Sequence, residues 1–120
     1  MLIQAKQLNK LVKDILKKGG SSNEEAKVVA EHLIRSNLAG HDSHGVGMLQ
    51  FYIRMLKNDL LRPNQTPRLI KADGSILMFE GQRGYGQAVG KIAMEQAIEK
   101  CRESGLVLMT LRNTHHLGRI

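Results

Sequence analysis

Four of the five histidines in this chain of 120 residues lie in two short polar clusters. The first cluster, residues 40–45, has the sequence GHDSHG, and the second, residues 113–118, has the sequence NTHHLG. An imidazole exchanges protons near neutral pH, and a neighbouring hydroxyl or carboxylate can fix which ring nitrogen carries the proton. These residue types indicate proton transfer, and we expect the two clusters to form halves of one active site.

Other chemistry for the first cluster stays open at this point. Asp42 or Ser43 could instead cap a helix by accepting hydrogen bonds from its free amides, with both histidines in solvent. His115 and His116 could add ligands for a metal, but no pair of histidines is spaced for one helix face, and we predict no metal site. The motif G-x-S-x-G of a serine nucleophile is also missing. A helix cap and proton transfer are the two leading interpretations.

A glycine-rich turn, Gly84-Tyr85-Gly86, lies between an expected strand and an expected helix. A dinucleotide-binding fingerprint occupies the same place in a Rossmann unit. Here the next glycine, Gly90, comes one residue too late for G-x-G-x-x-G, and no acidic residue follows between Leu106 and Ile120. We therefore interpret the turn as a tight connection into a helix.

The elements that must position these clusters begin with two helices. Apolar residues at helical spacing predict a helix over residues 3–18, which Gly19-Gly20 ends. Ser22 is expected to begin a second helix, with Glu25 three residues later completing a capping box, and Gly40 is expected to end it.

The second helix leads directly into the first cluster. His32 lies off its buried stripe and is assigned to the surface; the stripe consists of Ala26, Val29, Ala30, Leu33, Ile34 and Asn37.

A third helix is expected to follow the cluster, capped by Asp42 or Ser43. Gly45 and Gly47 in its first turn cost roughly 1 kcal/mol each relative to Ala. Such a cost suggests that something must approach the backbone closely. The apolar positions of this helix are Val46, Leu49, Ile53, Leu56 and Leu60.

The pattern changes after a connector at residues 63–67 that contains both prolines. Two strands are expected at residues 68–71 and 76–79, joined through Asp-Gly, which is a strong hairpin signal. A helix should then run to Ser104, and residues 106–111 predict an apolar strand that would be buried on both faces.

These elements predict an α+β fold in two domains. Residues 1–66 form a three-helix domain, and residues 67–120 form the incomplete beginning of a sheet domain with a hairpin, a helix and a strand. A hairpin and one strand make a thin sheet. We therefore expect the chain to be the front part of a longer protein, or to need a partner.

Composition narrows the class of protein. The net charge is +7, but the lysines recur along the first helix as a solvated face, and aromatic residues are scarce, so nucleic-acid binding is disfavoured. A single cysteine rules out an internal disulfide and a cysteine-based zinc site. No signal peptide or membrane-length apolar run is visible, so we expect no membrane association and a cytoplasmic location.

The residues Asp42-Ser43-His44-Gly45-Val46, followed by Leu49 and Tyr52, resemble the signature D-S-H-G-V-x-R-L-x-x-Y of the type 2 malate/L-lactate dehydrogenase family. The second cluster is similar to that family's N-S-x-H-x-G motif, and the segment around Gly84-Tyr85-Gly86 also fits. The resemblance implies an oxidoreductase that uses NAD or NADP, with a helical domain and a non-Rossmann, mainly antiparallel nucleotide-binding sheet.

The resemblance also implies roles for individual residues. His44 and Ser43 match the family's proton donor and its hydroxyl partner, and Tyr52 matches a tyrosine of the substrate pocket. Met48 stands where the family usually has an arginine that holds the substrate carboxylate. The second cluster matches a histidine next to the nicotinamide and the start of a cofactor-binding segment, namely His116, Leu117, Gly118, Arg119 and Ile120.

The function expected from the resemblance is hydride transfer between NAD or NADP and a small 2-hydroxy or 2-oxo acid of the malate or lactate type. Either His44 or His116 would be the acid/base, because oxidising the acid requires removal of its hydroxyl proton. The resemblance also implies a homodimer. The alternative is a non-catalytic helical interaction module, with the basic first helix as its binding face.

Overall fold

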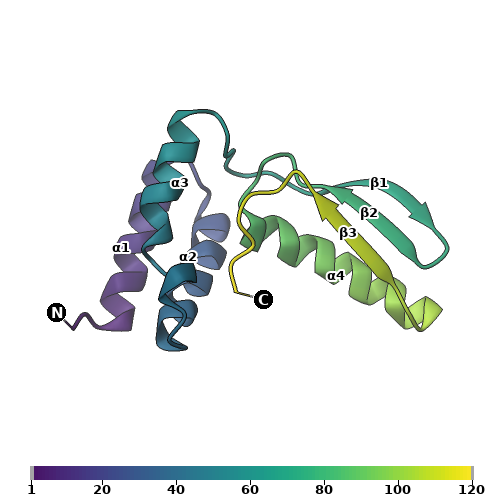
Figure 1. Ribbon diagram of the computed structural model, residues 1–120, viewed down its shortest axis with the longest axis horizontal. Coiled ribbons are helices and arrows are strands. Elements are labelled where there is room, and N and C mark those ends of the chain that lie inside the picture. The colour runs from purple at the N-terminus through teal and green to yellow at the C-terminus, as the bar shows by residue number, and fades with distance from the viewer. Residues whose placement is uncertain (1, 120) are drawn as a thin grey trace. The chain divides into compact units, whose positions relative to one another are not determined.

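The computed structural model describes residues 2–119 and contains two compact units (Figure 1). The helical unit comprises the chain up to Asn64 and the residues from Gly118 onward, and the sheet unit comprises Gln65–Leu117. The predicted α+β fold is confirmed, with helices first and then a hairpin, a helix and a strand. In chain order the elements are α1 (Ala5–Lys18), α2 (Asn23–Leu38), the 3₁₀ turn η1 (Asp42–His44), α3 (Met48–Lys57), β1 (Arg68–Asp73), β2 (Ile76–Glu80), α4 (Gly86–Ser104) and β3 (Leu108–Arg112).

The core of the helical unit is mainly aliphatic, as the composition predicts, and includes one aromatic residue, Tyr52. Helices α1 and α2 pack against each other, and burying each of their large side chains stabilises the unit by roughly 1.5–3 kcal/mol. From α3 the buried residue is Tyr52, whereas Ile53, which we predicted on the buried stripe, is 39% exposed. The fully buried aliphatic residues of α1 and α2 are Val12, Ala26, Val29, Ala30 and Leu33.

The start of α2 is capped as predicted, but the capping box is only half formed. Ser22 Oγ accepts a hydrogen bond from the Glu25 N–H at 3.1 Å. The Glu25 carboxylate does not return to Ser22; its Oε1 accepts the Asn64 N–H at 2.8 Å, and the Ser22 N–H donates to Asn64 Oδ1 at 2.7 Å. Two chain segments far apart in sequence are joined in this way, and burial raises the pKa of the Glu25 carboxyl above its usual range.

Helix α3 differs most from the sequence-based expectation. Asp42 and Ser43 do not cap it; they belong to η1, and α3 starts at Met48 after Gly47, with no side-chain cap. The prediction of a cap was therefore wrong.

His32 on α2 was also predicted at the surface, but it is half-buried, and this burial lowers the pKa of its imidazole.

The sheet unit has three strands in the order β1-β2-β3. Strands β1 and β2 form the predicted antiparallel hairpin, but both are longer than expected, so that only Gly74 and Ser75 connect them. Gly74 has φ +55°, which glycine adopts without steric cost. Strand β3 pairs with β2 in parallel, because the chain returns through α4 before it adds this strand.

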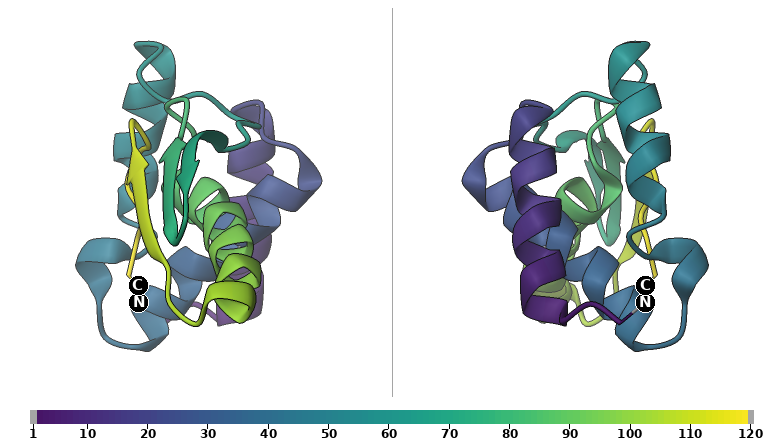
Figure 2. Two further views of the ribbon diagram at one scale, coloured as in Figure 1. Left: turned by 90° about the vertical axis from the view of Figure 1, so that its right-hand side faces the viewer. Right: turned by 90° about the vertical axis from the view of Figure 1, so that its left-hand side faces the viewer.

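Helix α4 lies along one face of the sheet, which Figure 2 shows nearly edge-on. The core of this unit consists of Leu77 and Phe79 from β2 packed against Ala93 and Ala97 from α4. On the other face Leu108 is 60% exposed, so the expectation that β3 is buried on both faces is wrong for the residues described. None of the helices within residues 2–119 combines the length and apolar character needed to cross a membrane.

Candidate active site

The first polar cluster forms a tight turn, residues 40–47, which we call the histidine turn. It begins where α2 ends: Gly40 has φ +77°, and the His41 N–H donates to the Ser36 carbonyl oxygen at 2.8 Å. The 3₁₀ turn η1 then reverses the chain, with the His44 N–H donating to the His41 carbonyl oxygen at 3.0 Å. His41 is exposed, whereas the side chain of His44 is half-buried.

Within the histidine turn, Ser43 and His44 are joined by a hydrogen bond. Ser43 Oγ lies 2.9 Å from His44 Nδ1. A hydroxyl at one ring nitrogen biases the tautomer and fixes the plane of the ring, which is the arrangement that a proton-transferring histidine needs. The structure thus brings together two of the three predicted catalytic residues.

Sequence reasoning missed the residue at the centre of this turn. We placed Asn37 on the apolar stripe of α2, yet its side-chain amide lies inside the histidine turn. Asn37 Oδ1 accepts the Val46 N–H at 2.9 Å, and Asn37 Nδ2 donates to Asp42 Oδ1 at 2.6 Å. A polar residue at a stripe position, three residues before Gly40, was the signal that could have identified it.

The two glycines of the turn differ in what surrounds them. A Cβ on Gly45 would lie 2.3 Å from Asn37 Oδ1, so the predicted close approach to the backbone is found there. A Cβ on Gly47 would meet nothing within 4 Å in the part of the chain that the structure describes. A glycine is therefore needed at position 45 because no room is left for a Cβ, whereas position 47 has room for a side chain.

The two predicted substrate residues both lie on α3. Met48 is its first residue and is half-buried, while Tyr52 is 1% exposed and belongs to the core. Tyr52 thus has an evident packing role, and its contact with a substrate stays a prediction.

In the sheet unit, the second cluster is organised around Glu80 at the end of β2. The residue is 9% exposed, and its carboxylate accepts hydrogen bonds from Arg112 Nε at 3.0 Å and from Asn113 Nδ2 at 2.5 Å. The Gln82 N–H adds a longer bond of 3.3 Å. The bond from Asn113, followed by those from Gln82 and Arg112, holds the pKa of Glu80 below its usual range. An ionised carboxylate therefore ties the end of β2 to the end of β3.

Backbone hydrogen bonds extend this connection toward the histidines. The Arg83 N–H donates to the Asn113 carbonyl oxygen at 2.7 Å, and the His115 N–H donates to the Gly84 carbonyl oxygen at 2.9 Å. Gln82, Arg83 and Asn113 all have positive φ, a backbone state that costs non-glycine residues energy and persists where surrounding contacts enforce it.

The glycine-rich turn has a role that the sequence did not reveal. A Cβ on Gly86 would lie 2.5 Å from the carbonyl oxygens of His115 and His116, and one on Gly90 would lie 2.8 Å from Leu117 Cδ2. The space that a nucleotide-binding fingerprint would offer to a pyrophosphate is thus filled by the chain's own residues 115–117. The interpretation as a tight connection into α4 is confirmed, and the glycines also seat the second cluster.

The two histidines of the second cluster are half-buried. Burial, and secondarily the neighbouring His116, lowers the pKa of His115, so this ring stays neutral to lower pH than an ordinary histidine. The predicted cofactor segment continues from His116 into Leu117, Gly118 and Arg119, while Ile120 lies outside the described residues. His44 belongs to the helical unit and His116 to the sheet unit, and their joining in one site stays a prediction.

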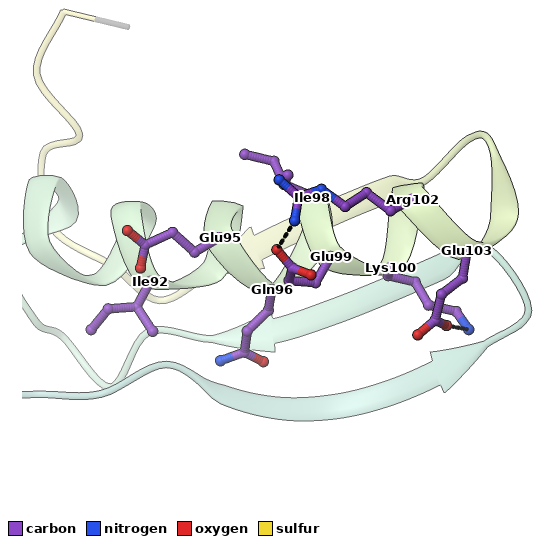
Figure 3. A pocket seen from close by; sticks show the side chains of 8 residues that line it. All are labelled: Ile92, Glu95, Gln96, Ile98, Glu99, Lys100, Arg102 and Glu103. Atoms are coloured by element: carbon purple, nitrogen blue, oxygen red, sulfur yellow. Dashed lines mark hydrogen bonds and ion pairs between the residues drawn. The ribbon is translucent and has the colours of Figure 1, made fainter.

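Neither the hollow along α4 nor any metal-binding cluster competes with this site among the described residues. A hollow of about 670 Å³ lies along α4 and contains none of the predicted site residues (Figure 3). Four of its charged residues form two ion pairs, Arg102 with Glu99 and Lys100 with Glu103. Among residues 2–119, no group of three or more His, Cys, Asp or Glu side chains is arranged to hold a metal ion. The hollow is lined by Ile92, Glu95, Gln96, Ile98, Glu99, Lys100, Arg102 and Glu103.

Comparison with known proteins gives a consistent result. The family model described as malate/L-lactate dehydrogenase matches residues 3–120. Hydroxycarboxylate dehydrogenase B of Escherichia coli K12 is 40% identical over 116 residues, which is 97% of this chain and 32% of that protein. L-sulfolactate dehydrogenase of Methanocaldococcus jannaschii is 36% identical over 118 residues, which is 98% of this chain and 34% of that protein.

Solved structures agree with the sequence matches. A putative malate/lactate dehydrogenase from E. coli superimposes with a TM-score of 0.96 at 38% identity, covering 99% of this chain and 33% of the other. The chain spans about a third of the length of these relatives. Because the family model matches nearly every residue, the chain belongs to the malate/L-lactate dehydrogenase family.

Proposed function

We propose that the full-length protein is a dehydrogenase that transfers a hydride between NAD or NADP and a small 2-hydroxy acid. Membership of the family and the names of the relatives, which are dehydrogenases of hydroxy acids, support this class of reaction. The observation that carries the proposal is the 2.9 Å hydrogen bond between Ser43 Oγ and His44 Nδ1.

His44 is the proton-transferring residue in this proposal. When a 2-hydroxy acid is oxidised, its hydroxyl must lose a proton as the C–H bond breaks, and a neutral imidazole can accept that proton. Because Ser43 holds Nδ1, we assign the transfer to Nε2. In the reverse direction the same atom returns the proton to the carbonyl oxygen of the 2-oxo acid.

A nicotinamide nucleotide supplies the hydride acceptor when it is bound. The segment from His116 to Arg119 has suitable chemistry, because an exposed guanidinium at Arg119 can meet phosphate oxygens. The glycine-rich turn is not available for this purpose, since residues 115–117 fill it. In this proposal the Arg119 guanidinium, rather than the backbone of the glycine-rich turn, would meet the nucleotide phosphates.

The substrate carboxylate needs a partner other than residue 48. The thioether of Met48 is a weak acceptor and cannot pair with an anion, so a cationic side chain elsewhere must hold the carboxylate. Malate- and lactate-like acids remain our proposal for the substrate class. A homodimer in the cytoplasm is part of the same proposal.

The first experiment is a titration of the full-length protein with NADH and NADPH, followed by nicotinamide fluorescence, and then turnover with a panel of 2-hydroxy acids. His44→Gln should lower kcat by about 100- to 10,000-fold, the range typical of general acid–base catalysis. His116→Gln, made in parallel, tests the other candidate. Undiminished turnover in both variants would overturn the acid/base assignment, and failure to bind either nucleotide would favour the non-catalytic interaction module.

A further inference from the structure

We propose that Asn37 is a positioning residue that braces the histidine turn and thereby aims the imidazole of His44. The inference rests on the proposed function, in which His44 transfers the proton. It concerns a residue outside the motif that carries the family resemblance, and it depends on contacts within the helical unit alone.

The amide of Asn37 connects the two sides of the turn. Its Oδ1 accepts the Val46 N–H at 2.9 Å, and its Nδ2 donates to Asp42 Oδ1 at 2.6 Å. The orientation of the amide is determined by these partners, because a backbone N–H only donates and an ionised carboxylate only accepts. In the sequence, His44 lies midway between Asp42 and Val46. The chain is therefore attached to the Asn37 side chain both before and after His44.

The space around Gly45 supports the same conclusion independently of the hydrogen bonds. Gly45 has φ −90° and ψ −157°, an extended conformation that other residues also adopt. The glycine is therefore not needed for backbone freedom. It is needed because a Cβ would lie 2.3 to 2.4 Å from the Oδ1, Cγ and Nδ2 atoms of Asn37. The turn thus closes directly onto the amide that braces it.

This brace matters because the other hydrogen bonds of the turn join residues close in sequence, and part of the turn is exposed to solvent. Asp42 and Ser43 are exposed, and the 3₁₀ hydrogen bonds of η1 close within a few residues. A displacement of about 1 Å at a catalytic group can reduce the rate roughly 100-fold. Asn37 belongs to α2, so it fixes the turn against a long helix rather than against the turn itself.

The test is an exchange of the two hydrogen-bonding groups. Asn37→Asp keeps an acceptor for the Val46 N–H. It also places two carboxylates in contact at positions 37 and 42, where the wild type has a donor and an acceptor 2.6 Å apart. We expect kcat to fall about 10- to 100-fold while KM for the nicotinamide nucleotide changes little. Asp42→Asn keeps the acceptor and should have little effect. The double variant Asn37→Asp/Asp42→Asn restores one donor and one acceptor, and it should recover most of kcat.

A matched control comes from the end of α3. Asn58 Nδ2 donates to the Arg54 carbonyl oxygen at 2.8 Å, so Asn58→Asp removes a comparable exposed amide bond outside the histidine turn. This control should retain wild-type kcat. If the double variant stays as slow as Asn37→Asp, or if Asn58→Asp is equally slow, the positioning role is overturned.

A second cycle uses Gly45. Gly45→Ala should displace the Asn37 amide and lower kcat as Asn37→Ala does, but it should cost nothing further in the Asn37→Ala background, where the amide is gone. Additive losses would contradict the brace. Hydrogen exchange of the Val46 amide should accelerate in each single variant, and this readout is independent of catalysis.

The His44→Gln variant separates the two ways of failing. If His44→Gln is impaired and Asn37→Asp is not, the proposed function stands and the positioning role of Asn37 is overturned. If His44→Gln retains full turnover, the assignment of the proton transfer to His44 has failed, and the role of Asn37 fails with it, while the class of reaction still stands.

Discussion

Ser43 and His44 are neighbours in sequence, and their side chains are joined by a hydrogen bond between Oγ and Nδ1. Ser43→Ala removes the hydroxyl that lies 2.9 Å from His44 Nδ1 and with it the contribution of that hydroxyl to the choice of tautomer. A net hydrogen bond contributes about 1 kcal/mol, so kcat of the full-length protein should fall roughly fivefold. Ser43→Thr keeps the hydroxyl and is the control in the same steady-state assay. A threonine variant as slow as the alanine variant would show that the hydroxyl itself is not what matters.

For single residues, the sequence indicates which side chains could react, but it does not indicate which other side chains position them. The serine and histidine were recognisable because their types are informative wherever they lie. Asn37 was not, because its bond to the Val46 N–H spans nine positions and depends on how the chain turns after α2. Helical periodicity placed it on a buried face, and only the three-dimensional turn explains why an amide occupies that face.

The start of α2 shows how one buried carboxyl can link two segments. Because burial raises the pKa of Glu25 above its ordinary value of 4.5, the folded state favours the protonated form. Stability from this group is therefore present below that ordinary value and is lost as pH rises through the higher folded pKa. Glu25→Gln keeps an acceptor for the Asn64 N–H without the charge.

We expect Glu25→Gln to match the wild type at low pH and to become progressively more stable than the wild type as the pH rises toward neutrality. Urea unfolding at a series of pH values, monitored by amide exchange in α2, measures this difference. A stability difference that is constant across the series would mean that the carboxyl does not titrate differently on folding.

Elements were predicted well where local signals dominate and poorly where distant contacts decide. Asp73 and Gly74 indicated the hairpin correctly. Gly105, which has φ +78° in the structure, indicated the end of α4 correctly. The start of α3 was misplaced because capping residues at Asp42 and Ser43 engage other partners. Glu25 shows the same limit, since its partner Asn64 lies 39 residues away and no local pattern points to it.

The stability of the helical unit depends on a small aliphatic core, with few aromatic residues to enlarge it. Leu33 is fully buried, whereas Leu38, one turn and a residue further along α2, is 72% exposed. Leu33→Ala should therefore cost about 2–5 kcal/mol in the free energy of unfolding, and Leu38→Ala should change it by less than about 0.5 kcal/mol. Urea denaturation of both variants tests this, and equal losses would mean that α2 does not bury the face described.

The seating of residues 115–117 on the start of α4 also bears on how the protein is made. A ribosome releases Gly86 and Gly90 well before it releases the segment that covers them. Until Leu117 has emerged, the first turns of this helix present bare backbone at two residues of weak helix propensity. The nascent helix should stay frayed there during synthesis and become ordered only when the histidine segment arrives.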